Sequence, residues 1–198
     1  MGLIFPHHGK WPEVHETAFI APSCDLIGEV KIGAYSSVWF QCVVRGDVNT
    51  ISIGERTNIQ DLSILHVTRK TAPLIIGDQV TVGHHAVLHG CTIKNRVLIG
   101  MGAVVMDGAE INDDTIVGAG SLVTPGKKYR SGVLIAGSPA KVIRELTIEE
   151  LNFLKQSAEN YVGDAMEYQK DLRGPKKFGQ SGRDLEEILI DEDGRIIR

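Results

Sequence analysis

The chain has 198 residues, of which 42% are hydrophobic and 23% are charged, and its formal net charge at pH 7 is −4. This is the composition of an ordinary globular protein, and its mild acidity gives no electrostatic basis for binding nucleic acid or an anionic membrane surface. No apolar run approaches the ~20 residues that a membrane-spanning helix needs, so we expect neither nucleic acid nor a membrane as a partner.

The cysteines are few, and their spacing excludes two common uses. Cys24, Cys42 and Cys91 are odd in number and widely separated. They fit neither a disulfide framework nor a CxxC zinc site. We therefore expect buried, reduced thiols in a cytoplasmic protein.

An aliphatic residue recurs every six positions from Ile20 to Val123, and it is often followed by glycine, as in IGAYSS, IGERTN and VGAGSL. A six-residue period suits neither an amphipathic helix nor a hairpin sheet. It is typical of a parallel β-helix, in which each hexapeptide forms one short strand and a corner. The aliphatic side chain is expected to point inward, and the glycine to let the backbone turn tightly.

Three hexapeptides make one triangular coil, so each aliphatic position can be assigned to a face. We name the faces a, b and c, counting from Ile76, Val82 and Leu88 respectively. Irregular loops on a rigid scaffold often carry binding sites, and here the departures from the six-residue spacing share one corner. They all fall between a c position and the next a position, namely Val44 to Ile53, Leu65 to Ile76 and Leu88 to Ile93.

Two histidines share one position in adjacent coils at this corner. His66 and His89 each directly follow a leucine at a c position, and Arg45 takes the same place one coil earlier. Adjacent strands lie ~4.8 Å apart, so two stacked imidazoles can share one ion with metal–nitrogen bonds of ~2.0–2.1 Å. The register therefore predicts a metal site that contains His66 and His89.

A third histidine, His84, belongs to face b and cannot easily reach His66 and His89 of its own chain. It can complete the site from a neighbouring subunit if face b of one prism packs against face c of the next. Three histidines with an open fourth position form the ligand set of a catalytic metal site. His85 is expected to be a bystander.

The chain divides into three expected segments. Residues 1–145 form the β-helix domain with an N-terminal arm. Residues 146–173 form a helix that begins with a capping box of Thr147 and Glu150 and then repeats apolar residues at helical spacing. Residues 174–198 form a linker and a β-hairpin with an Asp-Gly turn.

The hexapeptide prism, together with VVRGDVNTISIGERTNIQDLSILHV, VGHHAVLHGCTI and GSPAKVIRELT, makes residues 10–172 resemble the γ-class carbonic anhydrase family, most closely its short bacterial branch. The resemblance implies an all-β core, a left-handed parallel β-helix with a C-terminal α-helix packed alongside it. It also implies a homotrimer with zinc, or alternatively iron or cobalt, at each subunit interface. His66 and His89 of one chain and His84 of the next would bind the metal.

The same resemblance implies the reaction, the reversible hydration of CO2 to bicarbonate by a metal-bound hydroxide. Gln60 and Asn58 match polar residues beside the metal-bound water, with Gln60 orienting it. Arg45 and Asp47 match an intersubunit ion pair. Tyr161 matches a tyrosine near the metal.

The chain departs from the best-characterised active members in two places. Val48 stands where they carry a glutamate, and the basic segment VTRKTAPL replaces an acidic loop with a proton-shuttling glutamate. Both acidic helpers are missing, so we expect metal binding with low hydration activity. The alternatives are a hexapeptide-repeat acyltransferase, which uses one catalytic histidine in a protruding loop, and a non-catalytic metal-binding trimeric module.

Overall fold

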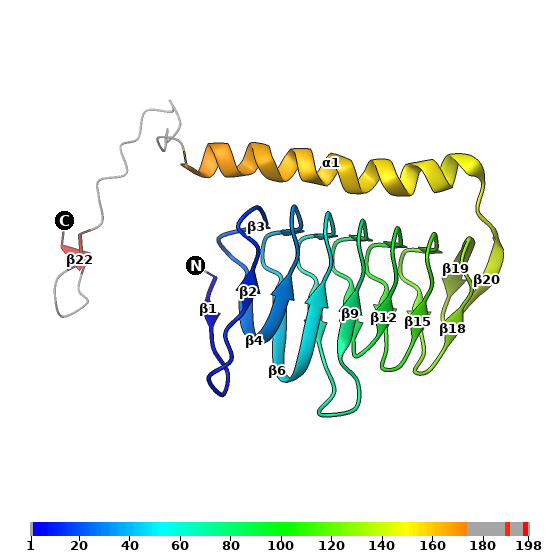
Figure 1. The fold of residues 1–198 in the computed structure, drawn as a ribbon, viewed down its shortest axis with the longest axis horizontal. Helices are drawn as coiled ribbons and strands as arrows, with labels where there is room; N and C mark the ends of the chain where they lie inside the picture. Colours follow the sequence, from blue (N-terminus) through cyan, green and yellow to red (C-terminus); the bar gives the residue numbers. More distant parts are fainter. Residues whose placement is uncertain (1, 174–188, 191–195, 198) are drawn as a thin grey trace.

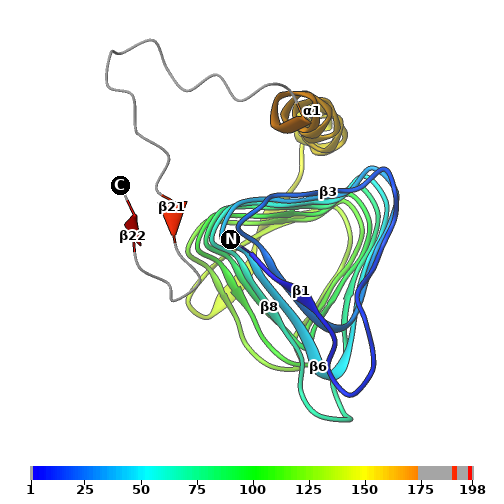
Figure 2. The ribbon, with the colours of Figure 1, turned by 90° about the vertical axis from the view of Figure 1, so that its left-hand side faces the viewer.

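The computed structural model describes residues 2–173, 189–190 and 196–197. The chain coils into a triangular prism of short parallel strands (Figure 2), with one long helix running along its outside (Figure 1). This architecture confirms the fold predicted from the repeat and the resemblance, a left-handed parallel β-helix with a C-terminal helix alongside it.

Face b is a separate sheet of eight strands, all parallel except for the last pair. Its strands are β3 (Phe19–Ile20), β5 (Ser37–Val38), β7 (Asn58–Ile59), β10 (Thr81–Val82), β13 (Leu98–Ile99), β16 (Ile116–Val117), β19 (Val133–Gly137) and β20 (Ala140–Glu145).

Faces a and c belong to one sheet of twelve strands, because two long strands, β4 (Asp25–Ile32) and β6 (Val43–Ile53), continue through the corner between them. The N-terminal strands β1 (Ile4–Phe5) and β2 (Glu13–Val14) pair with β4. Face c continues with β8 (Ile64–His66), β11 (Val87–His89), β14 (Val104–Val105) and β17 (Leu122–Val123), and face a with β9 (Leu74–Ile76), β12 (Thr92–Ile93), β15 (Glu110–Ile111) and β18 (Lys128–Tyr129).

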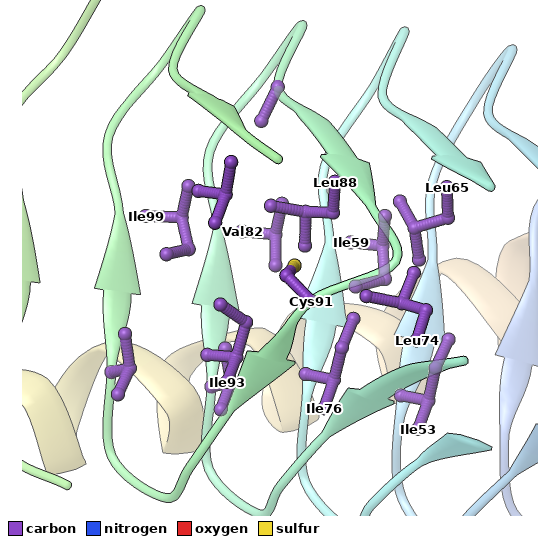
Figure 3. Packing of buried hydrophobic residues seen from close by; sticks show 14 of the residues in the cluster. Ile53, Ile59, Leu65, Leu74, Ile76, Val82, Leu88, Cys91, Ile93 and Ile99 are labelled. Atoms are coloured by element: carbon purple, nitrogen blue, oxygen red, sulfur yellow. The ribbon is translucent and has the colours of Figure 1, made fainter. Parts of the chain in front are cut away.

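The repeated aliphatic residues fill the prism. Each stacks on its equivalent in the next coil, so that Ile53, Ile76 and Ile93 form one column and Leu65 and Leu88 another (Figure 3). From Leu26 to Val123 every one of these positions is buried. Ile20 is half-buried, because it belongs to the first coil and has no complete coil beyond it.

The glycine that follows the aliphatic residue does not turn the corner, and that expectation was wrong. A Cβ atom on Gly33 would lie 2.5 Å from the carbonyl oxygen of Gly54 in the next coil, so the glycine permits close approach of two backbones. The left-handed corner conformation falls two residues later and is mostly taken by other residue types. Examples are Tyr35 and His85, with φ of 56° and 60°.

The helix α1 (Ile148–Arg173) lies over face b and contacts β3, β5, β7 and β10. The predicted capping box is present: Thr147 donates its N–H to Oε2 of Glu150 at 2.9 Å, and the N–H of Glu150 points to Oγ1 of Thr147 at 3.3 Å. The buried stripe comprises Leu154, Ala158, Val162 and Ala165. In the described part of the chain, no helix has the length and apolarity needed to cross a membrane.

Near the C-terminus, β21 (Leu189–Ile190) pairs antiparallel with β22 (Ile196–Ile197). The expected linker and the Asp-Gly turn between these strands lie outside the described residues.

Candidate metal centre

His66 and His89 end neighbouring strands and face each other. The parallel register of β8 and β11 pairs His66 directly with His89. Nδ1 of His66 lies 3.0 Å from Nε2 of His89, and the ring centroids are 5.0 Å apart. Both residues are followed by the irregular corner, where the loop between β8 and β9 protrudes from the prism (Figure 2). The structure thus brings two imidazole nitrogens to one point.

The other ring nitrogen of His66 meets a carboxylate. Nε2 of His66 lies 3.0 Å from Oδ1 of Asp47, and Oδ2 of Asp47 pairs with Arg45 of the same protomer. Partial burial raises the pKa of Asp47, but the hydrogen bonds with His66 and Arg45 outweigh it, and the pKa falls below its usual value. Asp47 therefore stays ionised and links Arg45 to His66.

His89 has an equivalent partner, Asp107, which the sequence reasoning missed. Nδ1 of His89 lies 3.0 Å from each carboxylate oxygen of Asp107, and Thr68 donates its hydroxyl to Oδ1 at 2.6 Å. Here too burial raises the pKa of the carboxyl group. The hydrogen bonds from Thr68 and His89 lower it by more, so the pKa of Asp107 falls below its usual value. The signal that could have found Asp107 is a carboxylate one coil beyond a predicted ligand, because metal-bound histidines usually donate to one.

His84 lies at a different corner, after β10, and its side chain is 43% exposed. Its Nδ1 lies 2.9 Å from Oδ2 of Asp61, one coil earlier. Within the described part of one protomer, no three His, Cys, Asp or Glu side chains gather into a metal-binding group. The expectation that face b itself packs against a neighbour needs correction, because α1 covers its first strands. His84 is exposed at the corner between faces b and c instead.

Asn58 and Gln60 lie on face b beneath α1, and both are buried. Nε2 of Gln60 donates to Oδ1 of Asn58 at 3.2 Å, and Nδ2 of Asn58 donates to Oγ1 of Thr81 at 3.0 Å. Oγ1 of Thr81 is 3.1 Å from Oγ of Ser157 on α1. A chain of hydrogen bonds therefore runs from the helix to Gln60, which directly precedes Asp61.

Tyr161 lies on α1 and packs edge-on against Trp39, with ring centroids 5.5 Å apart. Its hydroxyl pKa is raised, first by burial and then by the negative charges of Asp164 and Asp61. Tyr161 therefore lies over face b, where α1 packs on the first strands. His85 takes the left-handed corner position, which histidine tolerates better than most residues, and its side chain is exposed.

One protomer therefore carries two separate clusters of side chains, which we name as candidate half-sites. The first, called the paired-histidine half-site, comprises Arg45, Asp47, His66, Thr68, His89 and Asp107. The second, called the His84 half-site, comprises Asn58, Gln60, Asp61, His84 and Tyr161. Each of the three histidines has a carboxylate at one ring nitrogen, which leaves the other nitrogen for an ion. Such imidazole donors suit zinc, cobalt or iron.

Comparison with known proteins agrees with this architecture. The family model described as bacterial transferase hexapeptide (six repeats) matches residues 90–125. A solved hexapeptide transferase family protein from Anaplasma phagocytophilum is 44% identical, with a TM-score of 0.81, over 84% of this chain and 98% of that one.

Two curated relatives carry a more specific name. Gamma carbonic anhydrase 1, mitochondrial, of Arabidopsis thaliana is 50% identical over 77% of this chain, which spans only 57% of that relative. The carbonic anhydrase of Geobacillus kaustophilus is 46% identical over 84% of this chain and 91% of its own length. With nearly half of the residues identical over almost the whole of that relative, the chain belongs to the gamma carbonic anhydrase family of hexapeptide-repeat proteins.

Proposed function

We propose that the protein is a metal-dependent enzyme that hydrates CO2 reversibly to bicarbonate, with its metal held between two subunits of a homotrimer. The observation that carries the proposal is the 3.0 Å approach of Nδ1 of His66 to Nε2 of His89, with a carboxylate behind each ring. Two nitrogen ligands of one tetrahedral ion lie a little over 3 Å apart when each bond is ~2.0–2.1 Å long. The pair therefore supplies two ligands, and His84 of a neighbouring subunit supplies the third.

Exposed apolar residues around His84 support a subunit interface at this corner. Leu62 directly follows Asp61 and is 49% exposed, and Ile64 on face c is 45% exposed. Met101, one coil beyond His84, is 61% exposed. A cyclic trimer that buries this corner against the paired-histidine half-site of the next subunit would repeat the same contact three times. Across the interface, Arg45 and Asp47 would then also face the neighbour.

The native metal is proposed to be zinc, with iron or cobalt as alternatives. A divalent ion held by three histidines makes water nucleophilic near neutral pH. His66, His89 and His84 would hold the ion, and Asp47 and Asp61 would keep the rings of His66 and His84 oriented. Gln60, held by Asn58, would orient the water, and Tyr161 would lie beside it.

The proton released by hydration has no acidic acceptor at the two expected places. Val48 is half-buried and packs against the core, and the loop after His66 carries Arg69 and Lys70 with exposed side chains. Proton transfer to bulk buffer would then limit the rate. Cys24, Cys42 and Cys91 are all free and buried, which fits a cytoplasmic location, where thiols stay reduced.

The acyltransferase alternative needs a histidine in a protruding loop. The protruding segment between β8 and β9 contains Thr68, Arg69, Lys70 and Thr71, and its nearest histidine, His66, is engaged with Asp47. A purely structural metal would not need a buried amide such as that of Gln60, which directly precedes Asp61, the partner of His84. Both alternatives are therefore less favoured than hydration.

The test is a stopped-flow assay of CO2 hydration with the zinc, cobalt and anaerobically prepared iron forms. Metal content is measured on the same samples, and His84→Ala serves as the ligand-deficient control. We expect activity with at least one metal and its loss in His84→Ala. Metal bound without activity in any form would leave a non-catalytic module, and metal-free protein that transfers an acyl group would establish the acyltransferase.

A further inference from the structure

We propose that Asp107, locked in place by Thr68, is a positioning residue that sets which nitrogen of His89 faces the metal. This inference rests on the proposed function, because it takes His89 to be a ligand. It goes further by assigning a role to two side chains, Asp107 and Thr68, that lie outside the predicted ligand set.

The contacts of Asp107 determine the tautomer of His89. A carboxylate only accepts hydrogen bonds, and both oxygens of Asp107 lie 3.0 Å from Nδ1 of His89. Nδ1 must therefore carry the proton. Nε2, on the side that faces His66, is then left with a free lone pair that it could donate to an ion.

Thr68 removes the remaining freedom of the carboxylate. Its hydroxyl donates to Oδ1 of Asp107 at 2.6 Å, a short charge-assisted hydrogen bond. Thr68 is itself held, because Nδ2 of Asn49 donates to its carbonyl oxygen at 3.0 Å and its N–H donates to the carbonyl of Ala72 at 3.0 Å. The loop that follows His66 thus fixes the partner of His89.

The backbone leaves room for the carboxylate at one glycine. Gly90 directly follows His89 and has a φ of 53°. A Cβ atom at this position would lie 2.3 Å from Oδ1 of Asp107. The absence of a side chain at Gly90 is therefore what allows Asp107 to lie beside the ring.

Asp107 and Asp47 differ in their interaction partners. Asp47 shares its charge between His66 and Arg45. Among the described residues, Asp107 forms no ion pair with lysine or arginine, and its partners are His89 and Thr68. No cationic side chain therefore competes with the imidazole of His89 for this carboxylate, and the contact strengthens the ligand nitrogen of His89.

Two variants remove the contact in different ways. Asp107→Ala removes the carboxylate, and Thr68→Val removes only the hydroxyl that locks it while keeping a similar shape. Asp107→Asn keeps an acceptor for Nδ1 and serves as the conservative rescue. Asp113→Asn is the matched control, because its Oδ1 accepts the N–H of Asn95 and touches no histidine.

Two measurements are made on the full-length protein. Nitrogen-15 NMR of labelled histidine reads the tautomer of His89 without metal, with His89→Ala to assign the signal. Competition with a chelator gives the affinity for cobalt(II). We expect the Nδ1–H tautomer in the wild type and a mixture of tautomers in Asp107→Ala. Cobalt affinity should fall about 10- to 100-fold in Asp107→Ala, less in Thr68→Val and Asp107→Asn, and not at all in Asp113→Asn.

The outcomes separate this inference from the proposed function. If the wild type binds cobalt and Asp107→Ala and Thr68→Val both keep its affinity and tautomer, the positioning role is wrong although the metal site stands. If the wild type binds no metal, the proposed function fails, and the positioning role in metal binding fails with it. Thr68→Val keeps the test decisive if Asp107→Ala does not fold. A Thr68→Val variant that binds cobalt as tightly as the wild type would then contradict the proposal.

Discussion

Nδ1 of His66 lies 3.0 Å from Nε2 of His89, although the two histidines are 23 positions apart in the chain. The in-register pairing of β8 with β11 produces this approach, since one coil of the prism intervenes. A purely structural role is a poor explanation, because two imidazoles and two carboxylates at an irregular corner contribute little to a core of stacked aliphatic residues. We propose that the pair is half of a metal site.

Replacing Gln60 by alanine should separate chemistry from metal binding. Gln60 lies on face b and donates to Asn58, and it makes no described contact with a histidine. We expect unchanged metal content and a fall in kcat of about 10- to 100-fold, because the water loses its orientation. Stopped-flow kinetics with metal analysis on the same sample checks this. Loss of metal together with activity would mean that Gln60 acts on the ligands instead.

Hydration should depend on the concentration of an added proton acceptor. Val48 and the basic loop after His66 leave no carboxylate at the two expected acidic positions, one of which is that of the proton shuttle. We expect kcat to rise with imidazole buffer at constant pH and ionic strength, while kcat/KM stays constant. A kcat independent of buffer would show that another group in the chain carries the proton.

Gly33→Ala should destabilise the prism, because the added Cβ would lie 2.5 Å from the carbonyl oxygen of Gly54. Overpacking of this kind costs about 1–3 kcal/mol in the free energy of unfolding. Gly163→Ala is the matched control. Gly163 lies in α1 with nothing within 4 Å of an added Cβ, so this change should stabilise the protein by about 1 kcal/mol. Chemical denaturation measures both, and equal effects would contradict the role given to Gly33.

The stabilisation that Glu150 gives to the N-terminus of α1 should decrease in acid. Hydrogen bonds from Arg144 and from the N–H of Thr147 lower the pKa of Glu150 to about 2, from an ordinary value of 4.5. A carboxyl group whose pKa is lowered by folding stabilises the folded protein at pH values above its unfolded-state pKa. This stabilisation is lost as the pH falls toward its folded-state pKa. The wild type should therefore unfold at a higher temperature than Glu150→Gln near neutral pH, and the difference should shrink below about pH 4.5. A difference that does not change with pH would contradict this.

The sequence predicted what the repeat encodes and missed what depends on contacts between coils. The six-residue period predicted that Leu65 and Leu88 point inward on adjacent coils. The same register pairs the histidines that follow them, His66 and His89. The period did not predict Asp107, whose partner His89 lies in the preceding coil and whose position carries no periodic signal.

The position of the helix explains a second difference. Apolar spacing predicted α1, but it contains no information about which face the helix covers. The structure places α1 on face b through contacts such as Ser157 with Thr81 and Glu159 with Arg56. Those contacts bury Asn58 and Gln60 and leave His84 exposed at the corner.

The most direct test of a site shared between subunits is complementation between two inactive variants. His66→Ala damages the paired-histidine half-site, and His84→Ala damages the other. When equal amounts are unfolded together and reassembled, random trimers should regain intact interfaces at about one quarter of the sites, because each intact half comes from half of the subunits. The control mixture of His66→Ala with His89→Ala should regain none, since no subunit carries an intact paired-histidine half-site. We predict metal content and hydration activity near a quarter of the wild-type values in the first mixture and none in the control mixture. No recovery in the first mixture, or equal recovery in both, would contradict a site built from two subunits.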